Sequence, residues 1–345
     1  MGGSTGEVEM NDMDSTTGPA PGRGLWGDAW QRLRRHRLAM GCLWIVGIYT
    51  ILALYGEGVY RWHQWRDTTP SYQRTHVEHQ YTPPSFMRTP FASVQVDRNT
   101  GEEIERSGVS RVVYGLRELA RYPFGADGLG RDVLQRLIQG TRIAYQVGII
   151  TSLIAIPIGV ILGCLAGYFG GRVDDFIVWL YSTFAAIPGL LFILAIAMVV
   201  GQGLLGVYLG IGLTMWVGLC RLIRGEVIKH KERAYVVAAQ ALGISHFKII
   251  FRHILPNVFH VVIVTFTLRF PAAIGTEVFL SFLGIGVQGE PSWGIMISNA
   301  RLRLWHGIWW EMAFVTAAIF FIVLAFNLLG DALRDALDPR LREQQ

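Results

Sequence analysis

The chain has 345 residues, of which 51% are hydrophobic and only 17% are charged, and its mean hydropathy is +0.35. Soluble globular domains carry about 25% charged residues, so this composition excludes a disordered, collagenous or disulfide-rich protein and favours an integral membrane protein. The net charge of +5 does not indicate nucleic-acid binding, because the only lysines lie in one interior segment, at Lys229, Lys231 and Lys248. The three cysteines, an odd number, lie in apolar runs, so nothing requires an oxidising compartment.

The first 37 residues are expected to form a cytoplasmic N-terminal tail (1–37). Residues 1–22 are rich in Gly, Ser, Thr and acidic residues, a composition typical of disorder. Basic residues in short flanks stay on the cytoplasmic side, and four arginines precede the first apolar stretch: Arg32, Arg34, Arg35 and Arg37. Residues 38–55 are expected to form transmembrane helix 1 and not a cleaved signal peptide, because the preceding segment is too long and no small-residue cleavage site follows.

Residues 56–142 are expected to form an extracytoplasmic insertion. Within it, residues 94–105 alternate in polarity on both sides of an Asn-Thr-Gly sequence, which predicts a β-hairpin. Residues 130–140 have an apolar and a polar face, which predicts an interfacial helix that leads into the second span. The apolar face consists of Val133, Leu134, Leu137 and Ile138, and the polar face of Arg131, Asp132, Gln135 and Arg136.

The core at 143–330 contains the remaining membrane spans. A helix needs about 20 mostly apolar residues to cross the bilayer, and five more stretches qualify: 143–169, 176–200, 204–223, 258–287 and 308–330. Six spans place the C-terminal tail (331–345) and the Lys- and Arg-rich segment 224–257 in the cytoplasm. The sequence therefore predicts an all-α integral membrane protein with six transmembrane helices.

Segment 224–257 is more organised than a simple connection. Residues 226–242 predict a helix with a stripe of small residues, which Gly243 ends. Ser245 is expected to be the N-cap of a second, short helix, which Pro256 ends before span five. That helix has an apolar face with a basic flank. The small stripe is Ala234, Ala238 and Ala241, the apolar face is Phe247, Ile250, Phe251 and Ile254, and the flank is Lys248 and Arg252.

Two interpretations of this segment stay open on physical grounds. It is either a docking element for a soluble partner or an amphipathic connector on the bilayer surface.

Several motifs resemble a known family. Ala238-Ala239, Gly243 and the later Ile-Leu255-Pro256 resemble the EAA coupling loop of ABC-importer permeases. Further motifs, in order from residue 124 to the C-terminus, resemble the second of the two permeases of dipeptide, oligopeptide and nickel importers. They lie at residues 124–132, 167–171, 235–243, 249–257, 281–287, 291–294 and 329–340.

The resemblance implies a six-helix permease fold in the plasma (inner) membrane of a prokaryote, with a cytoplasmic coupling helix. It implies these partners: a second homologous permease, two ATPase subunits, an extracytoplasmic substrate-binding protein and membrane lipid. It implies that one ATPase docks on 224–257, through Ala238, Ala239, Gly243, Ser245, Phe247, Lys248, Ile250, Phe251, Arg252, Ile254, Leu255 and Pro256.

The chain is not expected to be an enzyme or to bind a cofactor. A phosphate-binding Walker A loop needs a Lys followed by Ser or Thr, whereas His230, Glu232 and Ile249 follow the three lysines. ATP and Mg are therefore expected in the partner subunits.

The chain departs from the family pattern at four places. Val237 stands where the family has Glu, and His253 where it has Ile. The outer segment 57–121 does not follow the common short pattern, and the connection 288–291 is shorter than usual.

An arginine and a glutamate lie inside span five, Arg269 and Glu277. A charge at mid-membrane costs roughly 2.5–3.5 kcal/mol, so each should face protein or water. Arg269 could meet a peptide carboxylate on the translocation pathway, and Glu277 is a second pathway candidate. The alternative is an interhelical ion pair or a snorkelling side chain.

Other patterns have a functional and a structural interpretation. Pro157, Pro188 and Pro271 are hinges or packing kinks. His76 and His79 are far more typical of an exposed pair than of a metal site. A group of tryptophans predicts an aromatic belt at the outer interface: Trp305, Trp309 and Trp310.

The sequence thus predicts a permease subunit of an ATP-driven, binding-protein-dependent importer, for peptides by resemblance. The alternatives are an autonomous channel or secondary transporter, and an intramembrane enzyme. The sequence shows no repeated halves, no coupling-ion site and no nucleophile–base pair.

Overall fold

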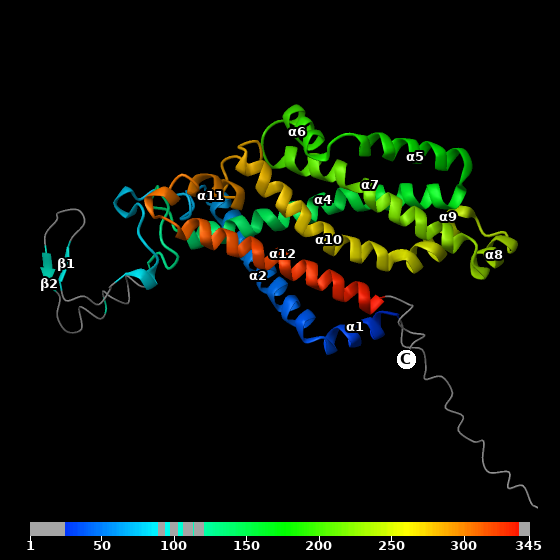
Figure 1. Cartoon of the computed structure of the whole chain (residues 1–345), viewed down its shortest axis with the longest axis horizontal. Coiled ribbons are helices and arrows are strands. Elements are labelled where there is room, and N and C mark those ends of the chain that lie inside the picture. Colours follow the sequence, from blue (N-terminus) through cyan, green and yellow to red (C-terminus); the bar gives the residue numbers. More distant parts are fainter. Residues whose placement is uncertain (1–24, 89–93, 97–102, 106–112, 114–120, 338–345) are drawn as a thin grey trace, which may run out of the picture.

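The computed structural model describes residues 25–88, 94–96, 103–105, 113 and 121–337 (Figure 1). The expected disordered tail 1–22, the predicted hairpin turn and the end of the C-terminal tail lie outside these residues. The described part is an elongated bundle of long helices, with α11, β1 and β2 at one end and α8 and α9 at the other (Figure 1). We call the first of these the outer end, because it contains the segment that is expected to be extracytoplasmic.

Five helices of the described chain are long and apolar enough to cross a membrane. They are α2 (Arg37–Trp65), α4 (Val133–Phe169), α7 (Leu204–Lys231), the continuous helix His246–Phe282 and α12 (Trp310–Leu337). A sixth apolar segment is a bent pair, α5 (Gly171–Ala186) and α6 (Gly189–Val200). The predicted set of six apolar membrane segments therefore agrees with five long helices and one broken one.

The prediction of a continuous span at 176–200 is wrong. The axes of α5 and α6 meet at 88°. Proline has no N–H and disfavours a helical conformation in the residue before it. Ile187 is accordingly extended (φ −84°, ψ 130°), and Pro188 is the N-cap of α6.

The predicted interfacial helix at 130–140 is the beginning of α4, which continues without a break for 37 residues. Asp132 caps α4, because its carboxylate accepts a hydrogen bond from the Leu134 N–H at 2.9 Å. Arg136 was expected on a solvated polar face and is only 3% exposed. Burial does not separate the two predicted faces, because Val133 and Arg136 are both buried and the other six residues are half-buried.

The core is built around α4. Every fourth residue of α4 from Gly159 to Gly167 is glycine, and a Cβ at Gly163 would lie 2.8 Å from the Cys220 carbonyl oxygen of α7. This stripe lets the two backbones approach closely, as is common between membrane helices. On another side of α4, Phe270 of α10 (Leu255–Phe282) packs edge-on against Tyr145 and stacks on Phe326 of α12, with a centroid distance of 4.3 Å for the stacked pair.

The outer end contains the short elements. The strands β1 (Val94–Val96) and β2 (Glu103–Glu105) pair antiparallel, with Val94 opposite Glu105, which confirms the predicted hairpin. The remaining outer elements are η1 (Val77–His79), η2 (Ser85–Met87), α11 (Trp293–Ala300) and η4 (Leu304–His306).

At the other end, a helix that the sequence did not predict, α1 (Leu25–Arg35), precedes α2. Leu33 of α1 packs with Ala325 and Leu329 of α12 in one apolar cluster.

Candidate functional site

The segment predicted to be a coupling element forms a bent pair of helices. The predicted single helix 226–242 is wrong, because α7 ends at Lys231 and α8 (Ala234–Ala241) begins after an extended Arg233. Lys229, His230 and Lys231 occupy the last turn of α7, where positive charge stabilises a helix end. We call residues 232–254 the elbow.

Gly243 ends α8, as predicted. Its φ is +71°, a left-handed conformation that glycine adopts without a Cβ clash. The Ile244 N–H donates to the Ala239 carbonyl, and the Gly243 N–H donates to the Gln240 carbonyl. This pair of bonds is the Schellman motif of helix C-termini, so the bend of the elbow is defined by the backbone at Gly243.

The second arm begins after Ser245, as predicted, although the Ser245 side chain makes no capping hydrogen bond. The prediction that Pro256 ends this helix is wrong. α9 (His246–Lys248) continues through a π-helical turn, η3 (Ile249–Ile254), into α10. The Leu255 N–H bonds five residues back, to Ile250. This change of partner places Pro256 in the first turn of α10, where a missing N–H is tolerated.

The predicted apolar face is not continuous, because it is divided between the interior and the surface. Ile250 and Ile254 are fully buried and pack with residues of α4, α7 and α8. Phe247 and Phe251 remain 61% and 45% exposed, and Leu242 at the end of α8 is 80% exposed.

The other predicted coupling residues also divide between the two environments. Ala239 is buried and Leu255 is half-buried, whereas the rest are exposed. The exposed ones are Ala238, Gly243, Ser245, Lys248, Arg252 and Pro256, and Val237 at the position of the family's Glu is exposed as well.

A buried tyrosine that the prediction missed joins the two arms of the elbow. The Tyr168 hydroxyl at the end of α4 lies 2.8 Å from His246 Nδ1 and accepts a hydrogen bond from Gln240 Nε2 at 3.3 Å. Gln240 and His246 stand on either side of Gly243. Tyr168 lies in the motif at 167–171, and nothing in the local sequence of that motif indicates a contact with the elbow.

Arg269 and Glu277 of span five do not pair with each other. Arg269 donates a hydrogen bond to the Met215 carbonyl of α7. Glu277 is 1% exposed and accepts a hydrogen bond from the Ser281 hydroxyl at 2.7 Å. Among the described residues neither of them forms an ion pair, so the interhelical ion pair is not realised.

The tryptophans and histidines of the outer end also have defined places. Trp305 is 91% exposed, whereas Trp310 is 6% exposed and donates a hydrogen bond to the Ala126 carbonyl. Trp310 is thus an internal anchor and not a member of an aromatic belt. His79 packs on Tyr122, and within the described residues no cluster of three or more His, Cys, Asp or Glu could hold a metal.

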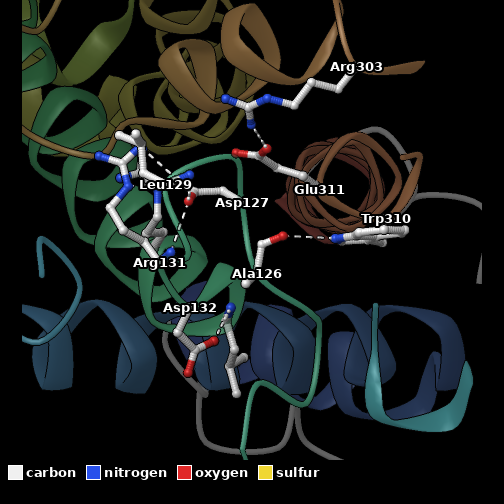
Figure 2. Close-up of polar contacts among 10 residues, drawn as sticks. Ala126, Asp127, Leu129, Arg131, Asp132, Arg303, Trp310 and Glu311 are labelled. Atoms are coloured by element: carbon white, nitrogen blue, oxygen red, sulfur yellow. Dashed lines mark hydrogen bonds and ion pairs between the residues drawn. The ribbon is translucent and has the colours of Figure 1, made fainter. Parts of the chain in front are cut away.

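The motif at 124–132 forms a buried polar network at the outer end (Figure 2). Asp127 is 1% exposed, and its carboxylate accepts hydrogen bonds from the Leu129 and Arg131 N–H groups and from Arg131 Nε at 2.8–2.9 Å. Glu311 of α12 pairs with Arg303 at 2.7 Å. Figure 2 shows these two pairs close together, with Trp310 bound to Ala126 beside them.

Asp132, the N-cap of α4, belongs to the same motif. Burial raises the pKa of Asp132, and the hydrogen bond from the Leu134 N–H opposes that rise. The motif 124–132 therefore contacts both the start of α4, through Asp132, and α12, through the hydrogen bond between Ala126 and Trp310.

Known proteins resemble the chain over most of its length. Residues 159–343 match the family described as the binding-protein-dependent transport system inner membrane component, and residues 24–84 match the N-terminal TM domain of oligopeptide transport permease C. The dipeptide transport system permease protein DppC of Bacillus subtilis (strain 168) is 35% identical over 91% of this chain and 86% of its own length. The oligopeptide transport system permease protein OppC of the same strain is 32% identical over 92% of this chain and 91% of its own length.

Two further similarities are more partial. The glutathione transport system permease protein GsiD of Pectobacterium atrosepticum is 40% identical over 63% of this chain and 72% of its own length. An inward-facing structure of the MetNI methionine ABC transporter aligns with a TM-score of 0.45 at 17% identity, over 60% of this chain and 96% of the other. From the family match and the two full-length relatives, we conclude that the chain belongs to the inner-membrane components of binding-protein-dependent transport systems and is a multi-pass permease subunit of an ABC importer.

Proposed function

We propose that this permease imports peptides and forms half of a translocation pathway with a second, homologous permease. The support is the identity of 35% and 32% to relatives named for dipeptide and oligopeptide transport, over more than nine-tenths of this chain. The family match favours this function over an autonomous channel, a secondary transporter or an intramembrane enzyme.

The elbow is the proposed docking site for one of two ATPase subunits, and the exposure of Phe247 and Phe251 is the observation that carries this assignment. Their neighbours Ile250 and Ile254 are fully buried and packed in the core. This packing holds the helix that carries the two phenyl rings in a defined position. Exposed aromatic side chains on a rigid element are typical anchors of protein interfaces. Lys248 and Arg252, both exposed, add positive charge beside them.

ATP and Mg belong to the ATPase subunits in this proposal. Closure of those subunits around ATP moves the elbow, and α10, which continues from it without a break, transmits the movement into the membrane. A substrate-binding protein delivers the peptide on the opposite side, at 56–142 and the connection around Pro291.

The proposed orientation places both termini and the elbow in the cytoplasm. α1, the end of α12 and the elbow lie toward the same end of the molecule, opposite the outer elements (Figure 1). Ser245→Cys should therefore resist a membrane-impermeant thiol reagent added outside, in a background without native Cys. Asn99→Cys, outside the described residues, should react, and the reverse pattern would overturn the orientation.

Arg269 and Glu277 remain pathway candidates in this proposal, because each is an ionisable group inside a membrane helix. Arg269→Met should then reduce transport and leave complex assembly and basal ATP hydrolysis intact. Normal uptake by this variant would end the pathway role of Arg269.

Uptake by cells tests the substrate class. A strain that lacks this chain should lose uptake of labelled dipeptides or oligopeptides, and the intact gene should restore it. Unchanged peptide uptake with a loss of nickel uptake would contradict the peptide assignment and leave the permease assignment in place.

A further inference from the structure

A polar cavity of about 360 Å³ opens at the outer end of the chain. Its volume lies in the range of about 300–1,000 Å³ that is typical of small-molecule sites. It lies between the start of α4, the connection 284–291 and α11. Side chains with hydrogen-bonding groups form much of its wall, among them Gln73, Arg131, Arg136, Gln288, Ser298 and Asn299.

Arg136 is the unusual residue of this wall. Its side chain is only 4% exposed. Its Nε is buried without a hydrogen-bond partner, and among the described residues its guanidinium donates no hydrogen bond. The nearest carboxylate oxygen, Asp127 Oδ2, is 3.7 Å away. A buried guanidinium with unused donors is costly unless an acceptor satisfies it.

The carboxylates around Arg136 do not supply a hydrogen-bond acceptor for its guanidinium. Asp127 is already bound by Arg131, at 2.7 Å from Nη2, so one carboxylate faces two guanidinium groups. Glu311 is paired with Arg303 at 2.7 Å. Glu290 also lines the cavity, and it is paired with Arg142 at 2.8 Å.

We propose that this cavity binds the carboxylate of a short peptide, with Arg136 as the group that receives it. The inference rests on the proposed peptide substrate and adds a place on this chain where the substrate is held. A carboxylate matches the planar guanidinium of Arg136 and forms charge-assisted hydrogen bonds with it. The neighbouring amides of Asn299 and Gln288 supply both donors and acceptors, as the peptide group requires.

The recessed shape favours a small substrate over an acidic side chain of the binding protein. A flat surface would suffice for a rim contact with a protein, whereas this cavity has room for a whole dipeptide and a polar wall on several sides. A protein ligand is nevertheless a distinct outcome of the test below.

The test uses the complete transporter in lipid nanodiscs, without its binding protein. Dialanine and dialanine amide, which lacks the terminal carboxylate, are titrated and their saturable binding is measured. We expect dialanine to bind more tightly than the amide, and Arg136→Met to weaken dialanine binding roughly ten- to hundredfold, as for loss of a charge-assisted hydrogen bond. Arg136→Lys should retain part of the affinity, because it keeps the charge and loses the planar fork.

Arg301→Met is the matched control, because Arg301 is an exposed outer arginine that lies over the Phe282 ring and is not part of the cavity wall. It should bind dialanine like the unchanged protein. If Arg136→Met does not fold, Asn299→Leu fills the cavity without removing a charge and should weaken dialanine binding to a similar extent.

Equal binding of dialanine and its amide would overturn the inference, as would an absence of saturable dialanine binding. Dialanine binding by Arg136→Met or Asn299→Leu at the unchanged affinity would also overturn it. Weaker binding of the substrate-binding protein to Arg136→Met, with dialanine binding intact, would assign the cavity to a protein contact instead. A different experiment tests the proposed function itself. Normal peptide uptake by cells that lack this chain would contradict that function, whatever the cavity binds.

Discussion

The elbow and the outer motif 124–132 both place charged and aromatic side chains at the ends of apolar helices, but they use them in opposite ways. Asp127 is buried and its carboxylate is bound by three N–H donors of its own motif. In the elbow, Lys248 and Arg252 are exposed and, among the described residues, form no ion pair. Trp310 of α12, which binds Ala126 of this motif, is buried, whereas Phe247 of the elbow is mostly exposed.

This difference indicates what each region contacts. A buried carboxylate that is bound by donors of its own chain stabilises the chain itself, because its removal leaves those donors buried and unpaired. An apolar and basic surface without an internal partner contributes little to folding and is available to another protein. Substitutions at the outer motif should therefore change the amount of folded permease, and substitutions on the surface of the elbow should change assembly.

The largest expected effect is that of Asp127→Ala. It leaves Arg131 and Arg136 without their shared carboxylate, and the loss of one partner of a buried ion pair costs about 3–5 kcal/mol. We expect little folded protein when detergent extracts are separated by size-exclusion chromatography. Asp175→Ala, at an exposed aspartate of α5, is the control and should be produced normally. A normal yield of monodisperse Asp127→Ala would show that the outer motif does not stabilise the folded chain.

A smaller but more specific effect is expected for Gly243→Val. A β-branched residue at φ +71° carries about 1–3 kcal/mol of backbone strain, which the chain relieves by changing the angle between α8 and α9. The permease should reach the membrane in normal amount and fail to retain its ATPase on co-purification.

Gly243→Asn is the matched variant, because asparagine is among the residues that adopt left-handed conformations most readily. It should retain most of the ATPase. If both variants bind the ATPase like the unchanged protein, the bend of the elbow has no role in coupling.

The sequence was sufficient for the long helices, because a segment within lipid must satisfy its own backbone hydrogen bonds and is apolar throughout. The sequence was not sufficient to predict at which residues the helices break. Pro157 and Pro271 lie inside continuous helices, whereas Pro188 stands at the bend of 88°. Local sequence cannot distinguish these outcomes, because neighbouring helices decide whether the freed carbonyl groups find other partners.

The candidate site was predictable in position but not in orientation. Spacing alone placed Ile250 and Phe251 on one apolar face, whereas the π-helical turn and the contact with α7 bury the first and expose the second. Likewise, periodicity placed Arg136 on a solvated face, and only the fold brings Asp127 and the outer connection over it. Tertiary contacts that cover a helix face leave no local signal in the sequence.

Within the elbow, a buried and an exposed side chain stand next to each other in the sequence, and they should differ in the same way. Phe251→Ala removes an exposed ring, and truncation of an aromatic anchor at an interface commonly costs about 2 kcal/mol or more, which is more than a tenfold loss of affinity. Folding should be unaffected, so binding of the ATPase to permease in nanodiscs is the measurement.

Ile250→Ala, one residue away, should behave in the opposite way. It opens a cavity in the core and should lower the folded amount, since such a truncation costs about 2–5 kcal/mol. A folding defect of Phe251→Ala equal to that of Ile250→Ala would show that the two faces of the elbow are not separate.

The smallest expected effect is that of Tyr168→Phe, and it tests whether the elbow also depends on a buried polar contact. The substitution keeps the ring and removes the hydroxyl that bonds to His246 and Gln240. A hydrogen bond of this kind contributes about 0.5–1.5 kcal/mol, so the melting temperature should fall by only a few degrees.

Because the two partners of Tyr168 lie on opposite arms of the elbow, substrate-stimulated ATP hydrolysis should fall more than the folded amount does. Gln240→Ala removes one of the two contacts and should have an intermediate effect on hydrolysis. Unchanged stimulation in both variants would mean that Gly243 and the buried isoleucines hold the elbow in place without Tyr168.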